Sequence, residues 1–265
     1  IFARTEGGEF AQRAETSDTL LMDFWMNKED GRKPIDYKIE AVTNKGKKEI
    51  AQITTQTREM NEEELLDMVQ FYTFRYFYYG AEPTSGMAPE RIHIDGEYPE
   101  NDAHIVTTGG TGFGIFGLIA GIERGWISKE QGLAHFEKMV TFLEKADRYH
   151  GIWAHWIDGQ TGKTKPFSPK DDGADLVESA FLMQGLLAVR ENYRNGNNDE
   201  KTLSQRINKL WEEMQWNFHT KNGENKLYWH WSPNFGWEMN FPLEGYNECL
   251  ITYVLASASP THSIS

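Results

Sequence analysis

Six stretches of the chain repeat apolar residues at helical spacing, and all of them follow residue 60. The pattern predicts helices over residues 62–79, 112–123, 129–147, 172–193, 200–218 and 246–258. Asn61 with Glu64, and Ser128 with Gln131, have the spacing of an N-terminal capping box. We therefore expect a helix to begin directly after Asn61 and another directly after Ser128.

Residues 1–58 follow a different pattern, in which short β-like runs are separated by turn residues. The runs cover residues 19–26, 37–43 and 49–55, and the turns are Asp30-Gly31 and Asn44-Lys45-Gly46. The pattern predicts a β-rich N-terminal segment over 1–58 and a helical domain over 59–265.

The predicted helices are of two kinds. Helices 129–147 and 200–218 carry one apolar stripe and a polar back, whereas 112–123 and 246–258 are apolar nearly all round. Helix 172–193 resembles the second kind after its acidic start. Since an all-round apolar helix is normally buried, the order from 112 onward is inner, outer, inner, outer, inner. This order is typical of a mainly α, (α/α)6-toroid-type arrangement of helical hairpins.

Three hairpins make only half of such a ring. We expect the N-terminal half of a toroid, truncated at its C-terminus, in a piece of a longer protein. The connections that lead into inner helices are long, at residues 80–111, 148–171 and 219–245. These three loops should share one rim of the ring, and long ordered loops often carry function.

Acidic residues crowd the start of the predicted helix 172–193. At about 100° per residue, Asp171, Asp175 and Glu178 would fall within one narrow arc of a helix, with Asp172 beside them. Glu248 stands at the start of the last inner helix. Paired carboxylates can act as the acid and base of a glycosidase. The alternative is that acids merely suit a helix N-terminus, where the dipole is positive.

Two of the long loops are rich in Trp and His. One runs from His150 to Gly159 and the other from Tyr228 to Trp237. Aromatic faces can stack on sugar C–H groups, and His and Asn supply hydrogen bonds. The candidate substrate-binding residues there are Trp153, His155, Trp156, Trp229, His230 and Trp231. The alternative is that about half of the Trp rings belong to the core.

Composition narrows the choice of partners. The 265 residues carry a net charge of −13, which disfavours binding to nucleic acid, and 13% of them are aromatic. No apolar run is long enough to span a membrane. Cys249 stands alone and is expected to be a packed thiol. The chain begins at Ile1 without Met, so we expect a processed product.

Metal and nucleotide motifs are weak. His155 with Asp158, or His230 with an acid, could bind a cation, but no dense ligand spacing occurs, and we expect no metal and no cofactor. Gly112, Gly114 and Gly117 match a dinucleotide-binding pattern without its later strand and acid, so close helix packing is the better interpretation.

Several longer motifs occur in order and resemble the glucoamylase-like domain family, which overlaps glycoside hydrolase family 144. They are Thr107–Gly114, Glu123–Ser128, Pro166–Glu178, Tyr228–Pro233, Gly245–Cys249 and Ser259–His262. The resemblance covers about residues 63–262. It implies an (α/α)6 toroid and an inverting hydrolase of β-1,2-glucan or sophoro-oligosaccharides, often exported to the periplasm or secreted.

The resemblance also implies that the acids of the Asp171–Glu178 motif line a cleft together with Glu248 and its neighbour Asn247. Glu178 or Asp175 would be the general acid or position the water, with Asp171 and Glu248 as alternatives. Two other functions stay open at this point: a carbohydrate-binding protein without catalysis, and a polysaccharide lyase that uses a Tyr or His base.

Overall fold

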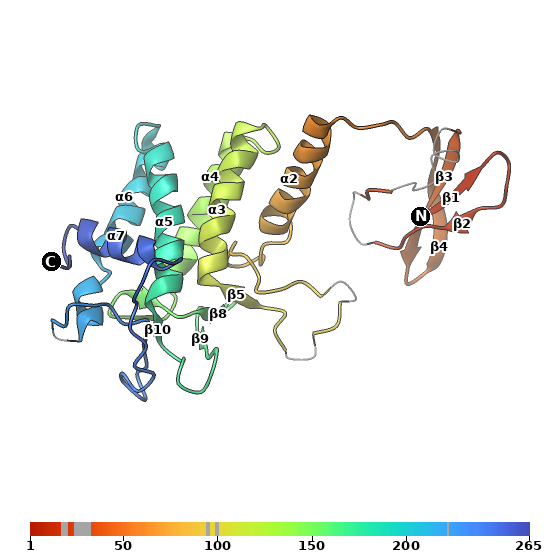
Figure 1. Cartoon of the computed structure of the whole chain (residues 1–265). Coiled ribbons are helices and arrows are strands. Elements are labelled where there is room, and N and C mark those ends of the chain that lie inside the picture. The colour runs from red at the N-terminus through yellow and green to blue at the C-terminus, as the bar shows by residue number, and fades with distance from the viewer. Residues whose placement is uncertain (17–20, 24–32, 94–95, 99–100, 222) are drawn as a thin grey trace. The chain divides into compact units, whose positions relative to one another are not determined.

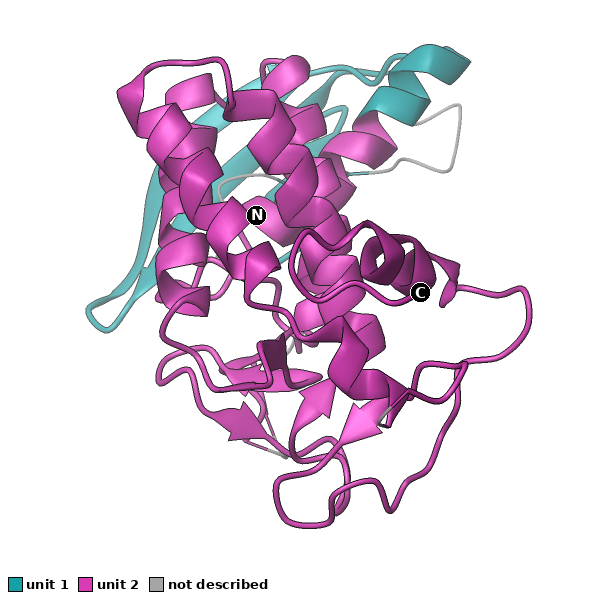
Figure 2. Cartoon of the chain, turned by 90° about the vertical axis from the view of Figure 1, so that its left-hand side faces the viewer, with its two compact units in different colours: residues 1–67 teal, residues 68–265 magenta. Residues whose placement is uncertain are grey.

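The computed structural model describes residues 1–16, 21–23, 33–93, 96–98, 101–221 and 223–265. The chain divides into two compact units, residues 1–67 and 68–265, coloured separately in Figure 2. The division falls within helix α2 (Glu62–Tyr78). Within the described residues, every helix is too short or too polar to cross a bilayer.

Unit 1 contains a four-stranded antiparallel sheet in the order β2-β1-β3-β4. The predicted runs 37–43 and 49–55 correspond to β3 (Ile35–Thr43) and β4 (Gly46–Thr55). The predicted turn at Asn44-Lys45-Gly46 joins them, with Gly46 at φ 111°, a conformation that favours glycine. The pattern missed β1 (Phe2–Thr5) and β2 (Ala11–Gln12), which are too short for a periodic signal.

Two predictions in this segment fall largely on undescribed residues. The turn Asp30-Gly31 lies outside the described residues, and so does most of the predicted run 19–26. Its described part, residues 21–23, has no regular secondary structure.

Unit 2 continues α2 and holds five more helices among its described residues: α3 (Thr108–Glu123), α4 (Lys129–Leu143), α5 (Leu176–Tyr193), α6 (Asn198–Glu212) and α7 (Leu250–Ala258). Both predicted capping boxes are present, because Asn61 and Glu64 bond reciprocally and so do Ser128 and Gln131. These helices begin where the sequence predicts.

Other helix limits differ from the prediction. Helix α3 begins four residues early, directly after strand β5 (Ile105–Thr107), and α4 ends at Leu143. Helix α6 ends at Glu212, and a 3-10 turn, η1 (Trp216–Thr220), replaces the predicted last turns. Helix α7 begins only at Leu250.

The helices of unit 2 form one connected set of neighbours (Figure 1). Helix α5 packs against α3, α6 and α7, and α4 packs against both α6 and α3. Close approach of α3 and α5 depends on glycine, because a Cβ at Gly112 would collide with the Phe181 carbonyl and one at Gly185 with the Gly112 carbonyl. A Cβ at Gly114 would collide with the Phe77 ring, so the interpretation as packing residues is confirmed for Gly112 and Gly114 but not for Gly117, which has room for a side chain.

The burial of the helices agrees only in part with the predicted alternation of inner and outer helices. Helices α4 and α6 bury one stripe, as expected, and α5 is largely buried. The expectation that 112–123 and 246–258 are buried all round is wrong. Four large apolar side chains on α3 and α7 are exposed: Phe113, Phe116, Leu250 and Val254.

The long loops come together at one end of the helices (Figure 1). Strand β5 pairs with β8 (Trp156–Asp158), which pairs with β9 (Thr164–Lys165). Strand β10 (Ala174–Asp175) pairs with β11 (His230–Trp231). Strands β6 (Arg148–Tyr149) and β7 (Ile152–Trp153) form a further hairpin. The three loops thus share a rim.

Candidate active site

Asp175 is the centre of a cluster of acids and histidines at this rim. It ends β10 and is the N-cap of α5, where its Oδ1 accepts a hydrogen bond from the Glu178 backbone N–H at 3.0 Å. The indole N–H of Trp229 donates to the same oxygen at 2.7 Å, and Oδ2 lies 3.1 Å from His155 Nδ1. The side chain is completely buried, so these contacts fix its position.

Asp171 joins the cluster through a tight turn rather than through a helix. Its backbone N–H donates to the Ser168 carbonyl at 3.0 Å, and its own carbonyl accepts from the Phe167 N–H at 3.0 Å. The helix starts only at Leu176, so the predicted helical arc through residues 171, 175 and 178 is wrong. The acids meet instead because a turn and the β10–β11 pairing fold them together.

Glu178 lies in the first turn of α5 and faces the beginning of α3. Its carboxylate accepts a hydrogen bond from the Gly109 backbone N–H, and a side chain at Gly109 would occupy its place. Burial and the nearby charge of Asp175 raise the pKa of Glu178 to about 7. The same two causes raise the pKa of Asp171 to about 7. Both carboxyls can therefore hold a proton near neutral pH.

Two histidines complete the cluster, and their pKa values are shifted in opposite directions. Burial works to lower the pKa of His155, but its hydrogen bond to Asp175 and the surrounding acids outweigh burial and raise it. Burial lowers the pKa of His230, whose Nε2 lies 3.5 Å from Asp171 Oδ2 and 3.7 Å from Asp175 Oδ2. One ring thus favours the charged form and the other the neutral form.

Three of these side chains could also offer ligands to a cation. One ligand atom each from His155, Asp171 and Asp175 lies within 4.8 Å of the others. However, the hydrogen bonds of Asp175 to Trp229 and to the Glu178 backbone already use one of its oxygens. The hydrogen-bonded acid–His cluster explains this geometry without an ion.

The aromatic candidates divide between the cluster and the core. Trp229 contacts Asp175 directly and stacks on His230, with centroids 5.4 Å apart. The Trp156 indole donates to Glu90 at 3.0 Å, and its ring meets His155 edge-on. Trp231 packs edge-on against His150 and Phe218.

Trp153 does not face the cluster. Its side chain has 0% exposure, and its indole N–H donates to the Leu143 carbonyl at 3.2 Å. The prediction that Trp153 binds substrate is therefore corrected: it is a core residue, held beneath the loop by the β6–β7 hairpin. Strand alternation alone could not show which face of this short loop points inward.

The remaining predicted residues lie at the edge of the cluster. Glu248 is exposed and precedes α7, yet it is near enough for its charge to raise the pKa of Glu178. Asn247 is also exposed and holds the local turn, where its Oδ1 accepts from the Cys249 N–H at 3.0 Å. Asp172 accepts from the Asn234 side chain at 2.6 Å.

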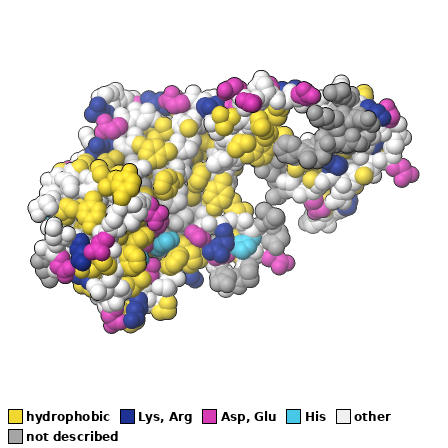
Figure 3. All heavy atoms as spheres, in the orientation of Figure 1, with side chains coloured by type: hydrophobic (Ala, Val, Ile, Leu, Met, Phe, Trp, Pro, Cys, Tyr) yellow, Lys and Arg dark blue, Asp and Glu magenta, His cyan; other side chains and the backbone are white. Residues whose placement is uncertain are grey.

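Sequence reasoning missed three contributors. Gly109 supplies a backbone donor that no side-chain pattern reveals. The Phe167 ring stacks on His155 at 4.3 Å, and the exposed Phe241 meets Trp229 edge-on at 5.6 Å. Both Phe residues lie in the long loops, so the aromatic content of the loops was the available signal. In the view of Figure 3, apolar side chains gather on unit 2, with acidic and His side chains among them.

Known proteins are similar to this chain in sequence, and solved structures are similar to it in fold. The chain is 44% identical over 251 residues to the exo-β-1,2-glucooligosaccharide sophorohydrolase (non-reducing end) of Parabacteroides distasonis, which matches 91% of this chain and 34% of that protein. The endo-β-1,2-glucanase structure from Chitinophaga pinensis, with sophorotriose and glucose, is 58% identical with a TM-score of 0.76 and covers 78% of this chain. The resemblance to the glucoamylase-like family is confirmed.

A third similar protein carries the family's name. A provisionally assigned glucoamylase structure from Bacteroides caccae is 60% identical, with a TM-score of 0.76 over 77% of this chain. No family model matches the chain. The chain spans 34% of the length of the Parabacteroides distasonis sophorohydrolase and 49% of the length of each of the two solved structures.

Proposed function

We propose that this chain carries the catalytic carboxylates of a glycoside hydrolase that cleaves β-linked glucans, most directly β-1,2-glucan or sophoro-oligosaccharides. The observation that carries the proposal is the pair of protonatable acids, Glu178 and Asp171, beside the buried Asp175. A glycosidase needs one carboxyl that keeps its proton near neutral pH and another that is ionised. Relatives named for action on β-1,2-linked glucose support the substrate class.

We assign the roles from the contacts. Glu178 is the proton donor, since its pKa is near 7 and its carboxyl is less enclosed than that of Asp175. Asp175 positions His155 and Trp229 and holds the start of α5. Asp171 and Glu248 are the candidates for activating water.

The spacing of the acids supports a choice of pair. Carboxylate oxygens of Asp171 and Asp175 lie within 4.8 Å of each other. An inverting enzyme separates its working carboxyls by about 6.5–9.5 Å to admit a water molecule. Inversion, which we propose, therefore requires Glu178 or Glu248 as one member of the pair.

We further propose that the helical hairpins of unit 2 are half of an (α/α)6 toroid. Helices α3, α5 and α7 pack side by side, and α4 and α6 pack against each other and against α3 and α5, which is consistent with an inner and an outer layer. The exposed Phe113 and Leu250 then belong to an inner face that the further helices of a complete toroid would cover. This face should bind a hydrophobic dye such as anilinonaphthalene sulfonate, and a lack of dye binding would contradict the proposal.

The test of function is hydrolysis of a panel of glucans, with the Parabacteroides distasonis sophorohydrolase as positive control. We expect new reducing ends from β-1,2-glucan, inverted product anomers by NMR, and loss of activity in Glu178→Gln. Binding without products would point to a carbohydrate-binding protein, and unsaturated products would point to a lyase. Periplasmic or secreted localisation is also a proposal, which fractionation of the source cells would check.

A further inference from the structure

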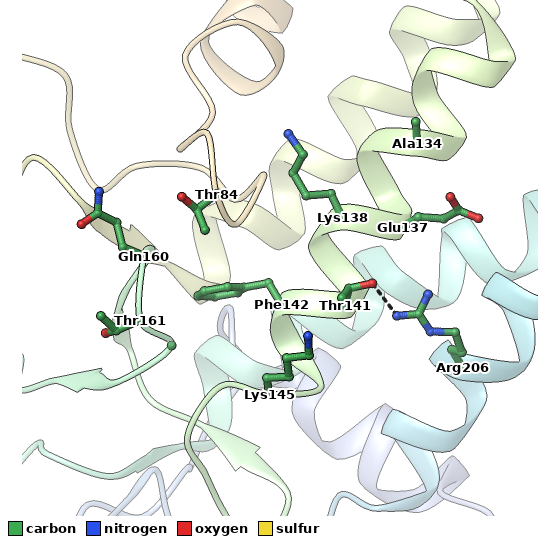
Figure 4. A pocket seen from close by; sticks show the side chains of 11 residues that line it. Thr84, Ala134, Glu137, Lys138, Thr141, Phe142, Lys145, Gln160, Thr161 and Arg206 are labelled. Carbon is green, nitrogen blue, oxygen red and sulfur yellow. Dashed lines mark hydrogen bonds between the residues drawn. The ribbon is translucent and has the colours of Figure 1, made fainter.

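Unit 2 also holds an open pocket of about 600 Å³, and no residue of the acid–His cluster lines it. It is bordered by α4, by Arg206 of α6, and by the loops that carry Thr84 and Gln160 (Figure 4). We propose that this pocket, the outer pocket, is a second saccharide-binding site that holds a glucan chain away from the catalytic acids. The identity of the saccharide rests on the proposed function.

An aromatic ring forms the middle of the outer pocket. Phe142 is partly exposed and packs against the core, and Figure 4 shows its ring pointing toward the loops of Thr84 and Thr161. Lys138 and Lys145 flank the ring on either side. Residues 138, 142 and 145 recur at helical spacing, so they share one face of α4 and the turn that follows it. A partly exposed ring offers an apolar surface to sugar C–H groups.

Polar groups surround this ring, as a sugar requires. Lys138 Nζ donates to the Pro83 carbonyl at 3.1 Å and keeps further donor capacity. Lys145, Gln160 and Thr161 are exposed at the rim of the outer pocket. Sugar hydroxyls both donate and accept hydrogen bonds, so a mixed set of ammonium, amide and hydroxyl groups suits them.

The walls of the outer pocket are fixed before any ligand binds. Asp158 Oδ1 accepts hydrogen bonds from the backbone N–H groups of Gln160 and Thr161 at 3.1 and 2.9 Å. On the opposite side, Arg206 donates to both oxygens of Glu144 at 2.9 and 2.8 Å and to Thr141 at 2.7 Å. A preformed site loses little conformational entropy on binding.

The charge of the outer pocket favours a neutral ligand. Three cationic side chains line it, but Arg206 is already paired with Glu144, and Glu137 adds a negative charge. The remaining balance is one positive charge, from Lys138 and Lys145 against Glu137, in a chain whose net charge is −13. One positive charge in so negative a chain does not select a multiply charged anion, so a glucan fits the outer pocket better.

The experiment is an NMR titration of the whole chain carrying Glu178→Gln, which prevents turnover. Linear β-1,2-glucan is added to one sample and inorganic phosphate to another. We expect glucan to shift the amide signals of Thr141 and Thr161. In a second variant, Lys145→Ala with Gln160→Ala should weaken this response about tenfold, as expected for the loss of one to two hydrogen bonds. The matched control is Lys201→Ala, an exposed lysine of α6 outside the pocket.

The outcomes separate this site from the proposed function. If glucan leaves Thr141 and Thr161 unshifted, or if phosphate alone shifts them, the outer pocket is not a saccharide site. If the wild-type chain hydrolyses glucan in that case, the proposed function still stands. If glucan binds at the outer pocket but is never hydrolysed, the site stands and the proposed hydrolase function fails.

Discussion

The fold has opposite effects on the acid between α4 and α6 and on the acids of the rim. Glu144, the C-cap of α4, pairs with Arg206 of α6, and the resulting hydrogen bond lowers the pKa of Glu144. At the rim, Glu178 and Asp171 have raised pKa values, and within the described residues no Lys or Arg pairs with them. Glu144 therefore favours its ionised form and supports stability, whereas the rim acids keep protons at a cost in stability.

The largest expected effect is on the rim. Glu178→Gln should lower kcat on β-1,2-glucan by about 10²–10⁴-fold, the usual contribution of a general acid, because the amide cannot donate the proton. The matched variant Glu191→Gln, an exposed acid of α5 that pairs with Arg194 outside both sites, should leave kcat unchanged. Equal activity in wild type and Glu178→Gln would remove the contrast between the two regions. Circular dichroism checks that both variants fold.

Asp175→Asn should lower kcat by about 10²-fold and also change the pH dependence of kcat. Asp175 holds His155 and Trp229 in place, and its negative charge acts on Glu178. Wild-type activity should decline above about pH 7 as Glu178 loses its proton. Because the charge of Asp175 contributes to the raised pKa of Glu178, the decline should begin at a lower pH in the variant. If kcat declines at the same alkaline pH in Asp175→Asn and in wild type, the charge of Asp175 does not raise the pKa of Glu178.

Trp229→Phe should have a smaller effect, about tenfold in kcat, which corresponds to the loss of one hydrogen bond to a charged group. The change removes only the indole N–H that donates to Asp175 and keeps an aromatic ring. Trp231→Phe is the matched control, because Trp231 belongs to β11 of the same strand pair and makes ring contacts. Equal losses in both variants would argue for general packing instead of a specific hydrogen bond.

Stability should depend on pH in opposite directions in the two regions. Glu178 has a folded pKa of about 7, above its ordinary value of 4.5, so the folded state binds more protons between these values. The free energy of unfolding should therefore fall by on the order of 2 kcal/mol from Glu178 as pH rises from 4.5 to 7. Urea unfolding of wild type and Glu178→Gln should show a shallower fall in the variant.

The smallest effect is expected for the ion pair between Glu144 and Arg206. Glu144 has a lowered pKa, so its contribution is present above the ordinary value of 4.5 and is lost as pH falls through the folded value. Because the pair is partly exposed, Glu144→Gln should cost less than about 1 kcal/mol at pH 7. Urea unfolding at pH 7 measures this loss, and an unchanged or higher free energy of unfolding in Glu144→Gln would contradict a stabilising role for this acid.

The sequence by itself determined the helices of unit 2, the two capping boxes and the β3–β4 hairpin, because periodicity and caps are local properties. It also placed Asp171, Asp175, Glu178, His155 and Trp229 among the candidates for one rim. Only the tertiary structure decided how they meet. The pairing of Asp175 with His230 across β10 and β11 joins residues 55 positions apart, and no local pattern encodes such a contact. The same long-range packing placed the Trp153 side chain in the core and left one side of α3 and α7 exposed.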